Sequence, residues 1–329
     1  MKRFSISRLA GVAVVVAALF ASSACGEDAE PPSGGPVDLS TVSLKVGDQK
    51  AISIEVLMRA SGQLENLPYE IEFSTFTAGP PLVEAAGAGG IDLAQVGNTP
   101  VIFGAAADAE IKIIGTLAAT GKGDAILVGK DSPVGSVADL KGQKVAVTKG
   151  SSANANLLLQ LRKVGLGLGD VEPVYLAPAD GYAALTRGDV QAWAVWDPYT
   201  AIAENEVGAR TIATADQAAN GYNFWVASNN ALGDAGRSAA IADFLARYAA
   251  ATTWSSDNLD LWSTKYAELT SIPVDASRIT WTRSIKEPIP LDEKVIASEQ
   301  EIADAFTEAN AIPGKISFAD FVDTRFESK

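Results

Sequence analysis

Five short turns in the sequence combine the residue types that bind small oxyanions. Each is rich in Gly, Ser, Thr, Asn or Pro, follows a predicted strand and opens a predicted helix. The first backbone N–H groups of a helix lack partners within it, and with nearby hydroxyl groups and the helix dipole they bind anions. Thr99, directly before Pro100, is expected to cap its helix. The five turns lie at residues 47–50, 77–80, 97–100, 149–154 and 196–199.

Side chains beside these turns offer further contacts to a ligand. Lys50 and Lys149 either add positive charge to the site or remain solvated, and Arg283 either reaches the site or forms a surface ion pair. Asp197, next to Pro198, is either a helix N-cap or a base without a visible partner. Six aromatic residues are expected to divide between the core and the wall of an apolar pocket, because alternate strand positions face opposite sides. They are Trp193, Trp196, Tyr199, Tyr222, Phe224 and Trp225.

The composition of the 329 residues argues against several classes of protein. The chain has no His and one Cys, so His-dependent catalytic triads, His-bound zinc and internal disulfides are ruled out, and no metal or cofactor is expected. The net charge of −14 opposes a nucleic-acid partner, which would need clustered Lys and Arg. The loop at 149–154 lacks the Gly-Lys-Ser/Thr that nucleotide phosphates require.

The N-terminal residues have the features of an export signal. Basic residues at positions 2, 3 and 8 precede an apolar run from Leu9 to Phe20, which is too short to span a bilayer. Small residues then lead to Cys25, and this arrangement resembles a bacterial lipoprotein signal. We expect a signal peptide at 1–24 and a tether at 25–40, with either a lipid anchor on Cys25 or cleavage by an ordinary signal peptidase. The protein is then extracytoplasmic, on the outer face of the cytoplasmic membrane or in the periplasm.

Strand and helix patterns alternate from Thr41 onward, as they do in α/β folds. After Ser228 long amphipathic helices follow, expected at 235–254, 259–269, 275–283 and 292–309. This order fits two α/β lobes, with a second lobe (129–225) inserted into the first (41–128 and 226–329). The expected strands lie at 42–46, 71–76, 92–96, 111–117, 125–128, 144–148, 172–176, 192–196 and 223–227.

Several stretches, taken together, resemble the aliphatic sulfonate-binding proteins of ABC importers, a group that also includes nitrate, taurine and thiamine-precursor binders. The stretches are VGDQK at 46–50, FTAGPPLVEA at 76–85, VGNTPVIF at 96–103, AILVGKDSP at 125–133, ADLKGQKVA at 138–146, KGSSA at 149–153 and DVQAWAVWDPY at 189–199. The resemblance implies a two-lobed periplasmic-binding-protein fold of type II, an ABC permease and its ATPase as partners, and a monomer. The chain departs from the family pattern at Asn98, where Asp or Glu is usual, and at Asn154, where His is frequent.

The resemblance also implies that turn amides and hydroxyl groups hold the sulfonate oxygens in a cleft between the lobes. With the side chains above, the candidate ligand-binding residues are Gln49, Lys50, Ala78, Gly79, Asn98, Thr99, Gly150, Ser151, Ser152, Asn154, Trp196, Asp197, Tyr222 and Arg283. The expected function is that of a non-catalytic receptor that closes on a small organic sulfonate. The alternatives are a nitrate, taurine or thiamine-precursor receptor of the same group, an exported hydrolase, and the effector-binding domain of a regulator.

Overall fold

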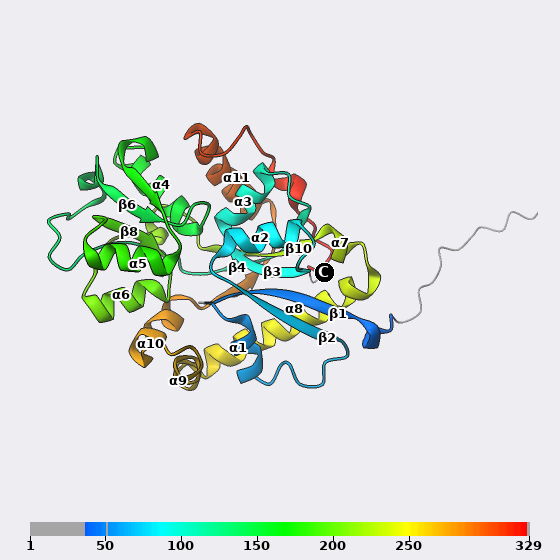
Figure 1. The fold of residues 1–329 in the computed structure, drawn as a ribbon. Helices are drawn as coiled ribbons and strands as arrows, with labels where there is room; N and C mark the ends of the chain where they lie inside the picture. The colour runs from blue at the N-terminus through cyan, green and yellow to red at the C-terminus, as the bar shows by residue number, and fades with distance from the viewer. Residues whose placement is uncertain (1–36, 51, 328–329) are drawn as a thin grey trace, which may run out of the picture. The chain divides into compact units, whose positions relative to one another are not determined.

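Two β-sheets, each covered by helices, organise the chain (Figure 1). The computed structural model describes residues 37–50 and 52–327, which belong to one compact unit. The expectations for the signal peptide, for Cys25 and for most of the tether fall at residues 1–36 and so lie outside the described residues. The described chain begins with a short 3-10 turn, η1, at Leu39–Thr41.

The first sheet has six strands in the order β11-β4-β10-β3-β1-β2. Strand β1 pairs in parallel with β2 and β3, whereas β10 runs antiparallel to β3 and β4. Its strands are β1 Ser43–Gln49, β2 Glu70–Phe76, β3 Leu93–Gly97, β4 Ile111–Ala118, β10 Tyr222–Ser228 and β11 Glu287–Ile289.

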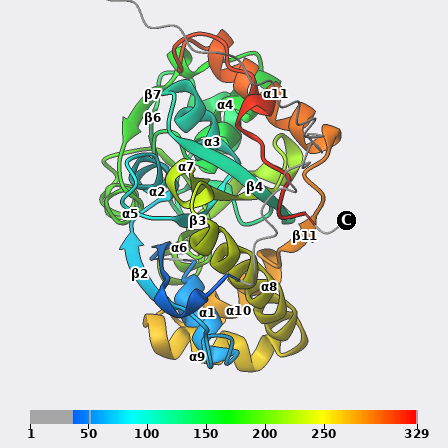
Figure 2. The ribbon, with the colours of Figure 1, turned by 90° about the vertical axis from the view of Figure 1, so that its right-hand side faces the viewer.

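Helices cover both faces of the first sheet. One buried cluster joins it to α2, α3 and α11, and another joins it to α1, α8 and α9. Figure 2 shows α3 and α11 above the sheet and α1, α8 and α9 below it. In the described part of the chain, no helix has the length and apolarity that a membrane span needs. The helices are α1 Ile54–Ala60, α2 Gly79–Gly87, α3 Asn98–Ala106, α7 Asn229–Leu232, α8 Ala235–Asp257, α9 Leu259–Thr270, α10 Val274–Arg283 and α11 Glu293–Glu308.

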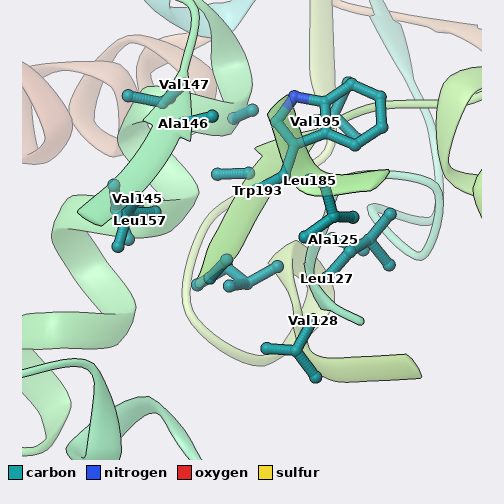
Figure 3. Close-up of a cluster of buried hydrophobic side chains, with 14 of the residues drawn as sticks. Ala125, Leu127, Val128, Val145, Ala146, Val147, Leu157, Leu185, Trp193 and Val195 are labelled. Carbon is teal, nitrogen blue, oxygen red and sulfur yellow. The ribbon is translucent and has the colours of Figure 1, made fainter. Parts of the chain in front are cut away.

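The second sheet has five strands in the order β7-β6-β8-β5-β9. Strands β5 and β8 are buried along their whole length, as expected for a sheet covered on both faces. Figure 3 shows their side chains packed with those of β6 and around Trp193. The elements are β5 Ala125–Val128, β6 Lys144–Val147, β7 Glu172–Tyr175, β8 Ala192–Val195, β9 Arg210–Thr214, α4 Ser152–Lys163, α5 Pro178–Arg187 and α6 Tyr199–Val207.

The expected strands and the four expected helices of the C-terminal part are confirmed, with bounds that differ by at most three residues. Strands β9 and β11 were not expected. Both are edge strands with one buried residue at most, and β11 contains Pro288, which sheets accept at an edge. The chain changes sheets at 119–124 and 215–221, before the crossings expected near Val128 and Trp225. The apolar sequences of β5 and β10 suit a buried strand in either sheet, so they do not mark the change.

Gly181 in α5 provides a test of the packing around Trp193. A Cβ atom at residue 181 would lie 2.4 Å from Nε1 of Trp193, so we expect Gly181→Ala to lower the free energy of unfolding by about 1–2 kcal/mol, despite the better helix propensity of Ala. Urea unfolding measures this. Gly169→Ala is the control, because no atom lies within 4 Å of that Cβ position. Equal stability of the two variants would contradict the described packing.

Candidate functional site

A cleft of about 90 Å³ lies where strands of both sheets end. Gln49 ends β1 and Asn98 follows β3, while Ser151 and Trp196 follow β6 and β8 of the second sheet. Ligands of open α/β sheets bind at this edge. The crossing segments and the end of α10 complete the lining. The volume is several times that needed by one water molecule, so the cleft accommodates a small polar group.

Nine of the fourteen candidate residues line this cleft. They come from the turns after β1, β2, β3, β6 and β8, from the start of β10 and from the end of α10, so segments far apart in sequence converge. The nine are Gln49, Gly79, Asn98, Ser151, Ser152, Trp196, Asp197, Tyr222 and Arg283.

The other five candidates lie outside the lining of the cleft. Lys50 is exposed, and so is Lys149, whose ammonium lies 5.7 Å from the centre of the Tyr175 ring. Ala78 is buried among the apolar side chains of the second sheet. The backbone N–H of Gly150 donates to Oδ1 of Asn154 at 3.0 Å, so these two residues fix the turn before α4. Their contact with a ligand stays a prediction.

Thr99 is the fifth of these candidates, and the expectation that it caps a helix was wrong. Helix α3 begins one residue earlier, at Asn98, and Gly97 is its N-cap. Pro100 is therefore the third residue of the helix, where its missing N–H also leaves no intrahelical bond unmade. The fully buried hydroxyl of Thr99 donates to Oδ1 of Asn98 at 2.8 Å.

The aromatic residues divide between core and cleft by their place along the strands and not by alternation, because Tyr222 and Phe224 fall on the same side of β10. Trp193, Phe224 and Trp225 are buried in the cores. Trp196 and Tyr222 line the cleft. The cleft wall is thus partly apolar, which suits a ligand with a carbon tail.

Four buried hydrogen-bond donors on cleft-lining residues have no partner among the described residues. They are Nε2 of Gln49, Nε1 of Trp196, Oγ1 of Thr280 and Nε1 of Trp281. Buried polar groups in native proteins are almost always hydrogen-bonded, and leaving one unsatisfied costs about 1–3 kcal/mol. Four such donors on residues that line one cleft suit a ligand rich in acceptor oxygens.

Asp197 and Arg283 place opposite charges in the cleft. Oδ1 of Asp197 lies 3.8 Å from Nη1 of Arg283 and accepts the N–H of Ala201, so Asp197 caps the first turn of α6, while its Oδ2 has no described partner. Nη2 of Arg283 also bonds Oε2 of Glu204 at 2.7 Å. Burial raises the pKa of Asp197 to about 7, although the charge of Arg283 works in the opposite direction.

A second charged pair, Asp124 and Lys286, also lines the cleft. Burial raises the pKa of Asp124 to about 6, partly offset by a hydrogen bond from Ser152 and by the charge of Lys286. Burial lowers the pKa of Lys286 to about 8, and its ammonium donates to Oε1 of Gln95 at 2.7 Å. Near neutral pH, the cleft therefore combines cations with carboxyl groups that are partly protonated.

The sequence did not single out several residues of this site. Asp124, Thr280, Trp281 and Lys286 lie on a crossing segment and around the end of α10, and Asn220 lies on the other crossing segment. None of them stands in a turn that opens a helix after a strand, since Asp124 follows Gly121 and Gly123 but leads into β5, and Asn220 leads into β10. The one signal in the sequence for this part of the site was the candidate Arg283, because Thr280 and Trp281 lie three and two residues before it. Within residues 37–50 and 52–327, no group of three or more acidic, His or Cys side chains is arranged to hold a metal ion.

Two sheets that share one cleft at their strand ends, lined by donors from both, are the arrangement of the solute-binding receptors. Comparison with known proteins agrees. A family model described as the periplasmic substrate-binding protein of phosphonate ABC transporters matches residues 64–268. A putative aliphatic sulfonates-binding protein of Escherichia coli is 35% identical over 88% of this chain and 92% of its own length. One of Bacillus subtilis is 30% identical over 97% and 96%.

A solved structure of a sulfonate-binding protein also matches this chain. The alkanesulfonate-binding protein SsuA from Xanthomonas axonopodis pv. citri, bound to MOPS, has a TM-score of 0.78 and 32% identity, covering 86% of this chain and 98% of that one. The chain therefore belongs to the aliphatic sulfonate-binding proteins of ABC importers, and the expected periplasmic-binding-protein fold is confirmed.

The raised pKa of Asp197 predicts how stability depends on pH. A carboxyl group whose pKa is higher in the folded state than in the unfolded state lowers stability as the pH rises between the two values. We expect the free energy of unfolding of the ligand-free protein to fall by about 2 kcal/mol more in wild type than in Asp197→Asn between pH 5 and 7.5. Urea unfolding at both pH values measures the difference.

Asp139→Asn is the control for this prediction. The hydroxyl of Ser136 holds the pKa of the exposed Asp139 below its usual value, so the contribution of Asp139 is lost only as the pH falls toward that value. The difference in the free energy of unfolding between wild type and Asp139→Asn should stay constant from pH 5 to 7.5. A constant gap for Asp197→Asn as well would contradict the assigned environment of Asp197.

Proposed function

We propose that this protein is an extracytoplasmic receptor that captures a small organic sulfonate in the cleft and delivers it to an ABC importer. The observation that carries the proposal is the set of four unpartnered donors around one cleft. A sulfonate group has three oxygens that accept hydrogen bonds, and its negative charge strengthens them. Arg283 and Lys286 add positive charge at the same place.

The donors belong to both halves of the molecule, which supports binding by closure. Gln49 lies on the first sheet, Trp196 follows a strand of the second, and Trp281 lies on α10, which packs against α6. We assign the two sheets, with their helices, to two lobes hinged at the crossing segments. A ligand that bonds both lobes stabilises the closed state in proportion to its preference for that state.

We assign to the closed state two ion pairs that join the two sets of helices. Arg283 bonds Glu204 at 2.7 Å on one side of the cleft, and Arg162 of α4 bonds Glu308 of α11 at 2.7 Å elsewhere. At the turn before α3, a Cβ atom on Gly97 would lie only 3.1 Å from Cβ of Ser152. A larger residue at 97 would hold the two turns apart.

Location and partners follow from this role. The family consists of extracytoplasmic proteins that act with ABC transporter components, and the N-terminal sequence has the pattern of an export signal. Lipidation of Cys25 would keep the receptor at the membrane beside the permease and its ATPase, and cleavage by an ordinary signal peptidase would release it into the periplasm. We expect the receptor to act as a monomer.

A binding role is favoured over a catalytic one. The relatives that match nearly the whole chain are named as binding proteins. The chain has no His, so a Ser-His-Asp or Cys-His nucleophile system is absent. A sulfonate incubated with the protein should therefore be recovered unchanged.

A thermal-shift panel tests the proposed ligand class. A ligand that binds only the folded state at one hundred times its Kd adds about 2.7 kcal/mol of stability. We expect alkanesulfonates to raise the melting midpoint by several degrees at this saturation. Nitrate, sulfate, taurine and a pyrimidine are the comparison compounds. A shift with nitrate or the pyrimidine alone would mean that the sulfonate assignment is wrong.

Trp196→Phe tests whether the unpartnered donors bind the ligand. The substitution removes one indole N–H, and loss of a hydrogen bond to a charged group weakens binding by about tenfold to a hundredfold. Isothermal titration with an alkanesulfonate measures the change. Trp262→Phe is the control, because Nε1 of Trp262 is also buried without a described partner but Trp262 does not line the cleft. Equal loss in both variants would refute the role of Trp196.

A further inference from the structure

Glu299, in the middle of α11, is a buried carboxyl group that the proposed function leaves unused. Its side chain has no exposed surface. Oε1 accepts a hydrogen bond from Nδ2 of Asn220 at 2.7 Å, while Oε2 has no partner among the described residues. A buried carboxyl group without a cation is expected to have a reason for its retention, because an apolar side chain there would be less costly.

Asn220 connects Glu299 to the cleft. It lies on the segment by which the chain returns from the second sheet to the first, and it lines the cleft. Its Nδ2 donates to Glu299 and also to Oγ of Ser298 at 2.8 Å. Its Oδ1 accepts Nδ2 of Asn98 at 3.0 Å and the N–H of Tyr222 at 3.2 Å. The two acceptors on α11 therefore fix which end of the Asn220 amide faces Asn98.

Asn98 connects the Asn220 amide to the first turn of α3. Its Nδ2 also donates to the backbone oxygen of Asn220 at 3.3 Å, and its Oδ1 accepts the hydroxyl of Thr99. The N-cap, Gly97, has no side chain to hold this turn. The turn is thus positioned by Asn220 from outside the helix. Figure 1 shows α11 next to α3, and the two helices are in contact.

We infer that Glu299 is a positioning residue for the cleft: it orients the Asn220 amide and, through it, the turn that carries Asn98. The inference rests on the proposed sulfonate-binding function, because it assigns a role within that site. Neutral Glu299 accepts from Asn220 at no electrostatic cost. Ionised Glu299 would accept more strongly from Asn220 but would be a buried charge without an ion-pair partner among the described residues, and we expect α11 to shift so that water solvates it. That shift would release Asn220.

Among residues 37–50 and 52–327, no basic side chain forms an ion pair with Glu299. Burial raises the pKa of Glu299 to about 8, and the hydrogen bond from Asn220 is the one influence that lowers it. Helix α3 has no charged residue, and Arg162 of α4 is paired with Glu308. The other charged residues on α11 and on the elements packed against it are Glu293, Lys294, Glu301, Asp304, Lys163 and Asp320.

The test is the dissociation constant of an alkanesulfonate at pH 7 and pH 9, by isothermal titration, for wild type and Glu299→Gln. Gln keeps an acceptor oxygen but cannot ionise. With a pKa of about 8, about one tenth of wild type is neutral at residue 299 at pH 9, so the apparent affinity falls about tenfold for this reason alone. The ratio of the wild-type Kd to the variant Kd should thus rise about tenfold between the two pH values.

Titration of Lys286 affects both proteins equally and cancels in this ratio. Glu301→Gln, which changes an exposed neighbour on the same helix, should follow wild type at both pH values. If the ratio of the wild-type Kd to the Glu299→Gln Kd changes by less than twofold between pH 7 and pH 9, the inference is wrong. If wild type binds no sulfonate at pH 7, the proposed function is wrong. Hydrogen exchange of the ligand-free proteins then tests whether Glu299 positions the turn at Asn98.

That exchange measurement compares the two proteins at the same pH. At pH 9, a peptide covering residues 97–106 should exchange several-fold faster in wild type than in Glu299→Gln, and the two should agree at pH 7. A peptide covering β6, in the second sheet, is the internal control. Equal exchange of the 97–106 peptide in both proteins at pH 9 overturns the inference independently of any ligand.

Discussion

Buried hydrogen-bond donors without protein partners are the constraint on which the arrangement of the cleft depends. When the lobes separate, water reaches these donors and satisfies them. In the proposed function, an oxyanion in the closed cleft satisfies them instead. The closed cleft without a ligand is the one state in which they are unsatisfied, and each of them then costs about 1–3 kcal/mol. The donors therefore couple closure to the ligand, and a receptor that signals occupancy by its closed shape needs this coupling.

Charge in the cleft explains how an acidic chain suits an anion. The net charge of −14 is spread over the molecule, and charges on exposed surfaces are screened beyond about 10 Å. In the cleft, Arg283 and Lys286 stand against Asp124 and Asp197, whose raised pKa values keep part of them neutral near pH 7. An incoming anion favours the neutral form of both carboxyl groups, because the charged carboxylates would repel the anion and the neutral groups do not. Arg283 is shared with Glu204 and so is already held in place before a ligand arrives.

The sequence was sufficient to predict the parts of the site that follow strands. Alternating and continuous apolar runs locate β1, β3, β6 and β8, and the turns after them place Gln49, Asn98, Ser151 and Trp196 at one edge. The other half of the site depends on tertiary packing. Thr280 and Trp281 reach the cleft because α10 packs against α6, a contact between elements about 75 residues apart that no local pattern encodes. The edge strands β9 and β11 were missed for a related reason, since their register is set by the neighbouring strand.

The two crossing segments limit how the lobes can move. The N–H of Ala119 donates to the backbone oxygen of Gly221 at 2.9 Å, and a Cβ atom on Gly221 would lie 2.1 Å from the oxygen of Ala119, so the segments run in contact and a side chain there would force them apart. The two crossing segments must therefore bend together. Asn220, the neighbour of Gly221, is held by three elements at once: by α11 through Glu299 and Ser298, by α3 through Asn98, and by β10 through Tyr222. This end of the crossing is fixed to the first sheet, and nearer the second sheet Gly121 has a φ of +74° that favours glycine. In the proposed closure, the hydrogen bonds that position the cleft therefore also hold one end of the hinge.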